Sequence, residues 1–177
     1  MIQLQFRHLL YDIEQQTYAI TTARGSESHE AKDEAQIDGT RHLSDLSLRY
    51  CEEGCAKLKV LIKGKLSADQ PVQPTIPEFP TDPSTDELAD TVAWNFSLTE
   101  EKPDAHTLTT LFHQFVVAYA LTQWSKAHAP NDVQGFIAQQ EQAKQQIKKA
   151  IYELGTPRKH RTPPIQMLEP EITIIQD

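Results

Sequence analysis

The sequence has few of the residues from which disulfide scaffolds, membrane spans and phosphate-binding loops are built. Its 177 residues include two cysteines and six glycines, and its longest apolar runs are short, such as residues 115–121. Two cysteines do not make a disulfide framework, and a membrane span needs about 20 apolar residues. The N-terminus also lacks the charged-then-apolar order of a secretion signal. We therefore expect a soluble, cytoplasmic protein with no membrane partner.

Sequence motifs for catalysis and cofactor binding are missing as well. No G-x-S-x-G, G-x-x-x-x-G-K or G-x-G-x-x-G occurs, so neither a nucleophile elbow nor a phosphate loop is indicated. Cys51 and Cys55 share one helical face, but no further pair completes a zinc site, which favours small buried residues. His106 and His113 lie seven positions apart, too far along a helix to share one ion. We expect a protein that is not an enzyme and that uses no cofactor and no metal.

Acidic residues dominate the charge, and they are concentrated in one segment. The formal net charge is −8, from 17 basic and 25 acidic residues. Residues 67–103 contain eight acids against the single Lys102, which gives this segment a net charge of −7. Because DNA affinity is mostly phosphate neutralisation, we expect no specific nucleic-acid binding and at most incidental proximity to DNA. Residues 158–161 form a small basic cluster that either interacts with the carbonyls at a helix end or contacts nucleic acid or an acidic surface of a neighbouring copy, such as residues 69–90.

Four stretches carry apolar residues at helical spacing. They cover about residues 4–23, 41–63, 104–127 and 132–154. The third stretch is apolar on most of its circumference, which predicts that it is the central helix. Its short connection to the fourth stretch predicts an antiparallel pair. Within the second stretch, residues 58–66 also alternate as a strand would, an alternative that we place below the helix.

Extended structure is predicted between the second and third helices. Proline recurs at every third position from 71 to 83, which matches the three residues per turn of polyproline II. The acidic stretch over about residues 67–90 is therefore predicted to be a stiff connector. Residues 91–98 alternate apolar with small or polar side chains, which predicts a strand. A lone strand is not stable, so it needs a partner from this chain or from another subunit.

These elements predict a mainly α fold, with a four-helix bundle-like core, a short β-strand region, an extended connector and a C-terminal arm. The predicted organisation is a single helical domain over residues 1–157, followed by the basic cluster and the extended arm over residues 158–177. Within the strand, Trp94 and Phe96 are candidate strand-pairing contacts, with burial in the core as the alternative.

Several stretches resemble a group of small prophage structural proteins from gut bacteria of the Bacteroides type. Residues 6–14 (FRHLLYDIE) are similar to the opening helix of these proteins. Residues 92–96 (VAWNF) stand where the group has a short strand before two long helices, and residues 119–124 (YALTQW) resemble part of its C-terminal half. Proteins of this group look like small helical adaptors that complete a phage neck between portal and tail, as rings of identical subunits.

The resemblance implies a phage or prophage virion structural protein, specifically a head–tail connector subunit that acts through homo-oligomerisation. Its implied partners are other copies of itself, in a possible ring, and phage portal or tail proteins, and its implied location is the virion. The residues that we expect at protein contacts are Trp94, Phe96, Arg158, Lys159 and Arg161. The alternative function is a host-encoded protein-binding module that uses the proline-rich segment as a ligand.

Overall fold

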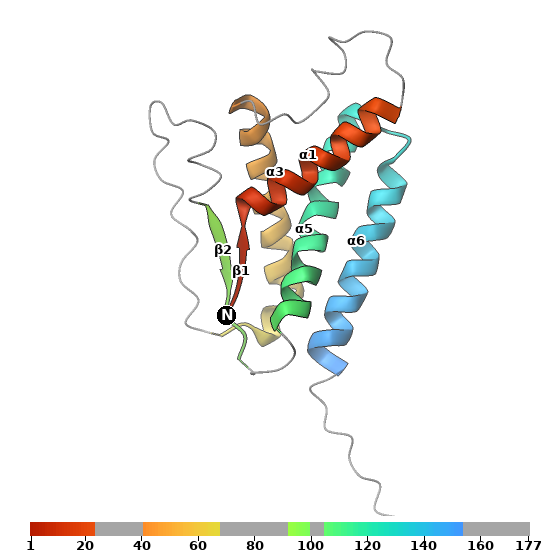
Figure 1. Ribbon diagram of the computed structural model, residues 1–177. Coiled ribbons are helices and arrows are strands. Elements are labelled where there is room, and N and C mark those ends of the chain that lie inside the picture. Colours follow the sequence, from red (N-terminus) through yellow and green to blue (C-terminus); the bar gives the residue numbers. More distant parts are fainter. Residues whose placement is uncertain (24–40, 68–91, 100–104, 154–177) are drawn as a thin grey trace, which may run out of the picture.

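The computed structural model describes residues 1–23, 41–67, 92–99 and 105–153, excluding the side chains of residues 41–45 and 153. These residues form four α-helices and a two-stranded sheet, which confirms the predicted mainly α fold class (Figure 1). The helices are α1 (Phe6–Ala23), α3 (Arg41–Leu61), α5 (Ala105–His128) and α6 (Val133–Lys148). The strands are β1 (Ile2–Gln5) and β2 (Ala93–Phe96), and short 3-10 and π turns occupy Lys63–Lys65 and Lys149–Glu153.

Helix α5 is the central helix of the described fold, as its apolar circumference predicts. The other three helices and β1 all pack against it (Figure 1). Its fully buried side chains include Phe112, Leu121 and Trp124. Helix α6 returns along it after a short turn in which the Asp132 amide donates to the Ala129 carbonyl at 2.9 Å. The predicted antiparallel pair is therefore present, with the last predicted turn of α6 wound as a π turn.

The first predicted helix begins at Phe6 rather than at residue 4, because the residues before it form strand β1. The sequence alternates there, with Ile2 and Leu4 buried and Gln3 and Gln5 exposed, and period two is the spacing of a strand. β1 pairs antiparallel with β2, and Leu4 stands opposite Trp94. The partner that the strand over residues 91–98 requires is thus supplied by this chain.

The second predicted helix, α3, is helical to Leu61 and then tightens into the 3-10 turn. The preferred helical interpretation is therefore confirmed for all but the last two of the predicted residues, 62 and 63. The strand alternative applies only beyond this turn, where Leu66 forms a β-bridge with Leu98. The Ser67 amide donates to the Ser97 carbonyl at 2.9 Å, so the chain leaves the described region at the sheet.

Two predicted features lie largely outside the described residues. The proline-spaced connector falls mostly within residues 68–91, and the C-terminal arm, with Arg158, Lys159 and Arg161, falls within residues 154–177. The division at residue 157 and the form of both segments therefore stay predictions.

Candidate functional site: a glutamine-lined groove

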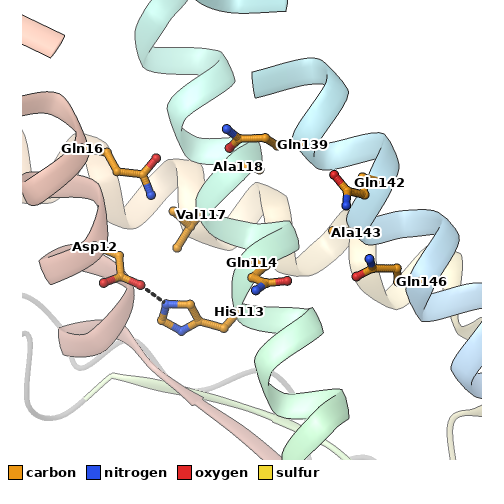
Figure 2. A pocket seen from close by; sticks show the side chains of 10 residues that line it. All are labelled: Asp12, Gln16, His113, Gln114, Val117, Ala118, Gln139, Gln142, Ala143 and Gln146. Atoms are coloured by element: carbon orange, nitrogen blue, oxygen red, sulfur yellow. Dashed lines mark hydrogen bonds and ion pairs between the residues drawn. The ribbon is translucent and has the colours of Figure 1, made fainter. Parts of the chain in front are cut away.

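A polar groove of about 400 Å³ lies between α1 and α6, above α5 (Figure 2). Its walls carry five glutamine side chains, contributed by three helices: Gln16, Gln114, Gln139, Gln142 and Gln146. Val117, Ala118 and Ala143 are almost completely buried beneath them. The groove therefore combines an apolar floor with walls of primary amides.

Helical spacing explains why these amides converge. Gln139, Gln142 and Gln146 recur at intervals of three and four on α6, so they share one face of that helix. Ala143 lies beside them at the contact with α5, where its small side chain lets the two helices approach closely. α1 closes the other side of the groove with Gln16, one turn after Asp12.

A side-chain hydrogen bond joins α1 and α5 at one end of the groove. Asp12 Oδ2 lies 2.7 Å from His113 Nε2, and both side chains are partly exposed (Figure 2). The same two residues also line a second hollow, of about 380 Å³, together with Arg7, His8 and Tyr11. The Asp12–His113 pair thus stands between two neighbouring depressions on the α1 side of the molecule.

The chemistry of this groove suits binding of a neutral polar group. Each glutamine amide offers two N–H donors and one carbonyl acceptor, and no lysine or arginine is among the residues that line it. A polypeptide backbone presents the same alternation of donors and acceptors. Amides do not take up or release protons near neutral pH, so these walls can position a ligand but cannot move a proton.

The outer face of α1 carries two exposed aromatic rings, one of which, Tyr11, lines the second depression. Tyr11 and Tyr18 have exposed fractions of 60% and 53%. They lie seven positions apart, about two helical turns, and therefore project from the same side of α1. Arg7 and His8 are exposed one turn before Tyr11. We call these four residues the tyrosine face.

Two of the residues that the sequence singled out for protein contact belong to the core instead, and the other three, Arg158, Lys159 and Arg161, lie outside the described residues. Trp94 and Phe96 have exposed fractions of only 3% and 0% and belong to the core. Trp94 packs edge-to-face on Phe6 with 6.1 Å between the ring centroids. Phe96 packs in the same way on Phe112 at 5.3 Å. Both rings occupy the core position that was the alternative, and their strand pairs within the chain.

The histidines that the sequence considered for metal binding are not brought together. His113 is paired with Asp12, and His106 is exposed near the start of α5. Over residues 1–23, 41–67, 92–99 and 105–153, no three His, Cys, Asp or Glu side chains are grouped so as to hold a metal ion. The sequence analysis did not predict a role for Asp12 or for the glutamines that line the groove. The spacing of the α6 glutamines was the feature of the sequence from which their shared face could have been predicted.

Cys51 and Cys55 are buried, as their place on the apolar face of α3 predicts. Burial raises the pKa of both thiols well above its usual range; the neighbouring thiol of Cys55 adds to the effect at Cys51, and the positive charge of Lys59 opposes it at Cys55. We expect Ellman's reagent to find no reactive thiol at pH 8 in the folded protein and two in urea.

The pH dependence of stability follows from the same shift. The buried thiols contribute their full stabilisation below the pKa of an unfolded thiol, about 8.5, and lose it as the pH rises above that value. Urea midpoints should therefore fall from pH 8 to pH 10, and by less in the Cys51→Ala/Cys55→Ala variant. A rapid reaction of either thiol with Ellman's reagent in the absence of urea would contradict the burial of the two cysteines.

No family model, curated protein or solved structure matches this chain. No helix within the described part of the chain is long and apolar enough to cross a membrane.

Proposed function

We propose that this chain is a non-enzymatic structural subunit that acts through homo-oligomerisation, and specifically a head–tail connector of a phage or prophage virion. The observation that carries the proposal of self-association is the tyrosine face of α1. The connector assignment rests on the resemblance of the sequence to small prophage structural proteins. Its partners would be further copies of the chain and the portal or tail proteins.

The tyrosine face has the composition of a protein–protein contact. Tyrosine and arginine are enriched among the residues that dominate binding energies, because they bury a large area and keep a polar end. Tyr11 borders the hollow of about 380 Å³, so the exposed ring lies beside a depression that a partner side chain can fill. The glutamine-lined groove adjoins it through the Asp12–His113 pair and offers hydrogen bonds to a partner backbone.

The same surface favours binding over catalysis. The groove walls are amides, and the Asp12–His113 pair has no serine, cysteine or threonine hydroxyl or thiol among the residues that line either depression. A histidine–carboxylate pair activates a nucleophile only when that nucleophile lies within hydrogen-bond reach. The alternative of a host-encoded binding module depends on the proline-rich segment, which lies outside the described residues.

Light scattering coupled to size exclusion, over a range of protein concentrations, tests self-association. We expect a reversible oligomer, and the Tyr11→Ser/Tyr18→Ser variant should associate about thirtyfold more weakly, since anchor residues often contribute about 1 kcal/mol or more each. The matched control is Tyr11→Phe/Tyr18→Phe, which keeps both rings and should associate like the parent chain. A monomer at every concentration, or equal association of the serine and phenylalanine variants, would contradict the proposal.

The virion part of the proposal has its own test. Induction of a lysogen that carries this gene, purification of the particles and mass spectrometry should find the chain in a fixed ratio to the portal protein. Particles that contain portal and tail proteins but lack this chain would exclude the connector role, whatever its oligomeric state.

A further inference from the structure

A third depression, of about 270 Å³, lies on the other flank of α6, where α3, α5 and α6 meet. Its apolar part consists of Val60, Leu61 and Phe115, and Lys57 and Lys144 stand at its rim. We call it the lysine-rimmed groove. Because Gln140 and Lys144 line it, it uses a different face of α6 from the one that carries Gln139, Gln142 and Gln146.

The exposed side chain of Val60 indicates that this groove is a protein interaction site. Among the residues that the structure describes, its exposed fraction of 74% is the largest of any exposed aliphatic or aromatic side chain after that of the N-terminal methionine. At the end of α3 the Tyr152 hydroxyl donates to the Leu61 carbonyl at 3.3 Å, which brings an exposed ring close to the groove. Apolar side chains that stand together at a depression are typical of interaction sites.

Lysines outnumber carboxylates around the groove, although Glu53 accepts a hydrogen bond from the hydroxyl of Tyr119, which lines it. Lys57 is exposed on α3, and Lys63 and Lys148 are exposed near the ends of α3 and α6. Lys144 Nζ is paired with Glu141 at 2.7 Å, a contact within α6 that a competing carboxylate can replace because both side chains are partly exposed. The groove therefore suits an occupant that carries both carboxylates and apolar side chains.

We propose that the lysine-rimmed groove binds the acidic, proline-spaced segment, residues 68–91, of a second copy of this chain. This inference rests on the proposed function, because it assigns one joint of the homo-oligomer. The segment contains six acidic residues and no lysine or arginine. Ile76 and Phe79 supply apolar side chains beside Glu78 and Asp82. A chain whose proline spacing favours an extended form loses little conformational entropy when it binds.

The ends of this segment favour a second copy as the donor. Ser67 and Val92, which flank it, are both held at the sheet by backbone hydrogen bonds to Ser97 and Phe6. The sheet lies on the other side of α5 from α6 (Figure 1). A segment that begins and ends there can extend toward a neighbouring copy, and only a second copy as donor makes self-association depend on Lys57 and Val60. Such a contact joins two different surfaces, and head-to-tail contacts of this kind form a ring when the rotation between subunits closes and a filament when it does not.

Charge reversal at the rim tests the inference on the full chain. Lys57→Glu should weaken self-association about tenfold, because it replaces an attraction by a repulsion, and the loss should be smaller at high salt. The matched control is Lys126→Glu, the same charge change at an exposed lysine near the end of α5, which should leave association unchanged. Val60→Ser should weaken it several-fold without any change in charge.

The reciprocal change tests the occupant. Glu78→Lys/Asp82→Lys should weaken association as Lys57→Glu does, and the combination of Glu78→Lys with Lys57→Glu should restore part of it. Association that is equal in the Lys57→Glu, Val60→Ser and Lys126→Glu variants would overturn the groove while leaving the proposed homo-oligomer intact. Weakening by Lys57→Glu with no effect of the Glu78 and Asp82 changes would overturn the assigned occupant. A parent chain that is monomeric at every concentration would overturn both proposals.

Discussion

Trp94→Ala should lower the free energy of unfolding by about 3–5 kcal/mol, the usual cost of removing a large buried aromatic ring. The indole has an exposed fraction of 3%, stands opposite Leu4 in the sheet and packs edge-to-face on Phe6. Its removal leaves a cavity between the sheet and α1, and it weakens the packing that holds β2 against the core. Urea denaturation followed by circular dichroism measures the change.

The control for this prediction is Tyr18→Ala, which removes a ring that is more than half exposed. Its cost should be about 1 kcal/mol or less, as for most surface substitutions. Both variants are compared at a concentration at which the chain is monomeric, so that self-association does not contribute. A cost below about 1 kcal/mol for Trp94→Ala would mean that the ring is not part of the core.

The long helices could be predicted from the sequence because each repeats its apolar spacing over several turns. α5 is the clearest case, since its apolar residues cover most of its circumference and require neighbours on several sides. α3 was harder to assign, because residues 58–66 fit both periods until the 3-10 turn separates helix from β-bridge.

Strand β1 was not predicted, although its alternation is regular. Four residues carry little periodic information, and Leu4 also continues the apolar spacing of the helix that follows. The feature that makes residues 2–5 a strand is their pairing with residues 93–96, about ninety positions later. The hydrophobic pattern of a short segment does not identify a pairing strand at that distance, so the register of the sheet could not be predicted from the sequence.

The candidate site could not be predicted from the sequence, for a related reason. Asp12 and His113 are 101 positions apart and meet only because α1 crosses α5. The α6 glutamines could be recognised as a polar face, which predicts exposure to solvent but not a groove. What turns that face into a groove is the distance between α1 and α6 across α5, and no spacing within one helix encodes it.

Gly54→Leu should lower the free energy of unfolding by about 1–3 kcal/mol, because it overpacks the contact between α3 and α5. A Cβ atom at Gly54 would lie 3.3 Å from both Tyr119 Cδ1 and Val116 Cγ1, so the rest of a leucine side chain has no space. Glycine inside a helix costs about 0.5–1 kcal/mol relative to alanine, and close approach of the two helices explains its presence at this position.

The same substitution has a spectroscopic signature. Burial, the hydrogen bond that the Tyr119 hydroxyl donates to Glu53 and the charge of that carboxylate raise the pKa of Tyr119 to about 12. A leucine at position 54 displaces the Tyr119 ring, so the pKa of Tyr119 should fall toward about 10, its ordinary value. Absorbance at 295 nm across alkaline pH follows the ionisation of the tyrosines directly.

The same pKa shift makes stability depend on pH. Because the raised pKa favours the neutral phenol, the contribution of Tyr119 to the free energy of unfolding is present below about pH 10 and is lost as the pH rises toward about 12.

Gly135→Ala is the matched control, since Gly135 lies in α6 at a position where an added Cβ atom would meet nothing within 4 Å among the described residues packed around it. This variant should stabilise the protein by about 0.4–1 kcal/mol, through the lower conformational entropy of its unfolded chain. The two substitutions thus have opposite expected signs, although each replaces a helical glycine. If Gly54→Leu were neutral and left the Tyr119 titration unchanged, α3 and α5 would have to be farther apart in solution, and the packing of α3 on the central helix would need revision.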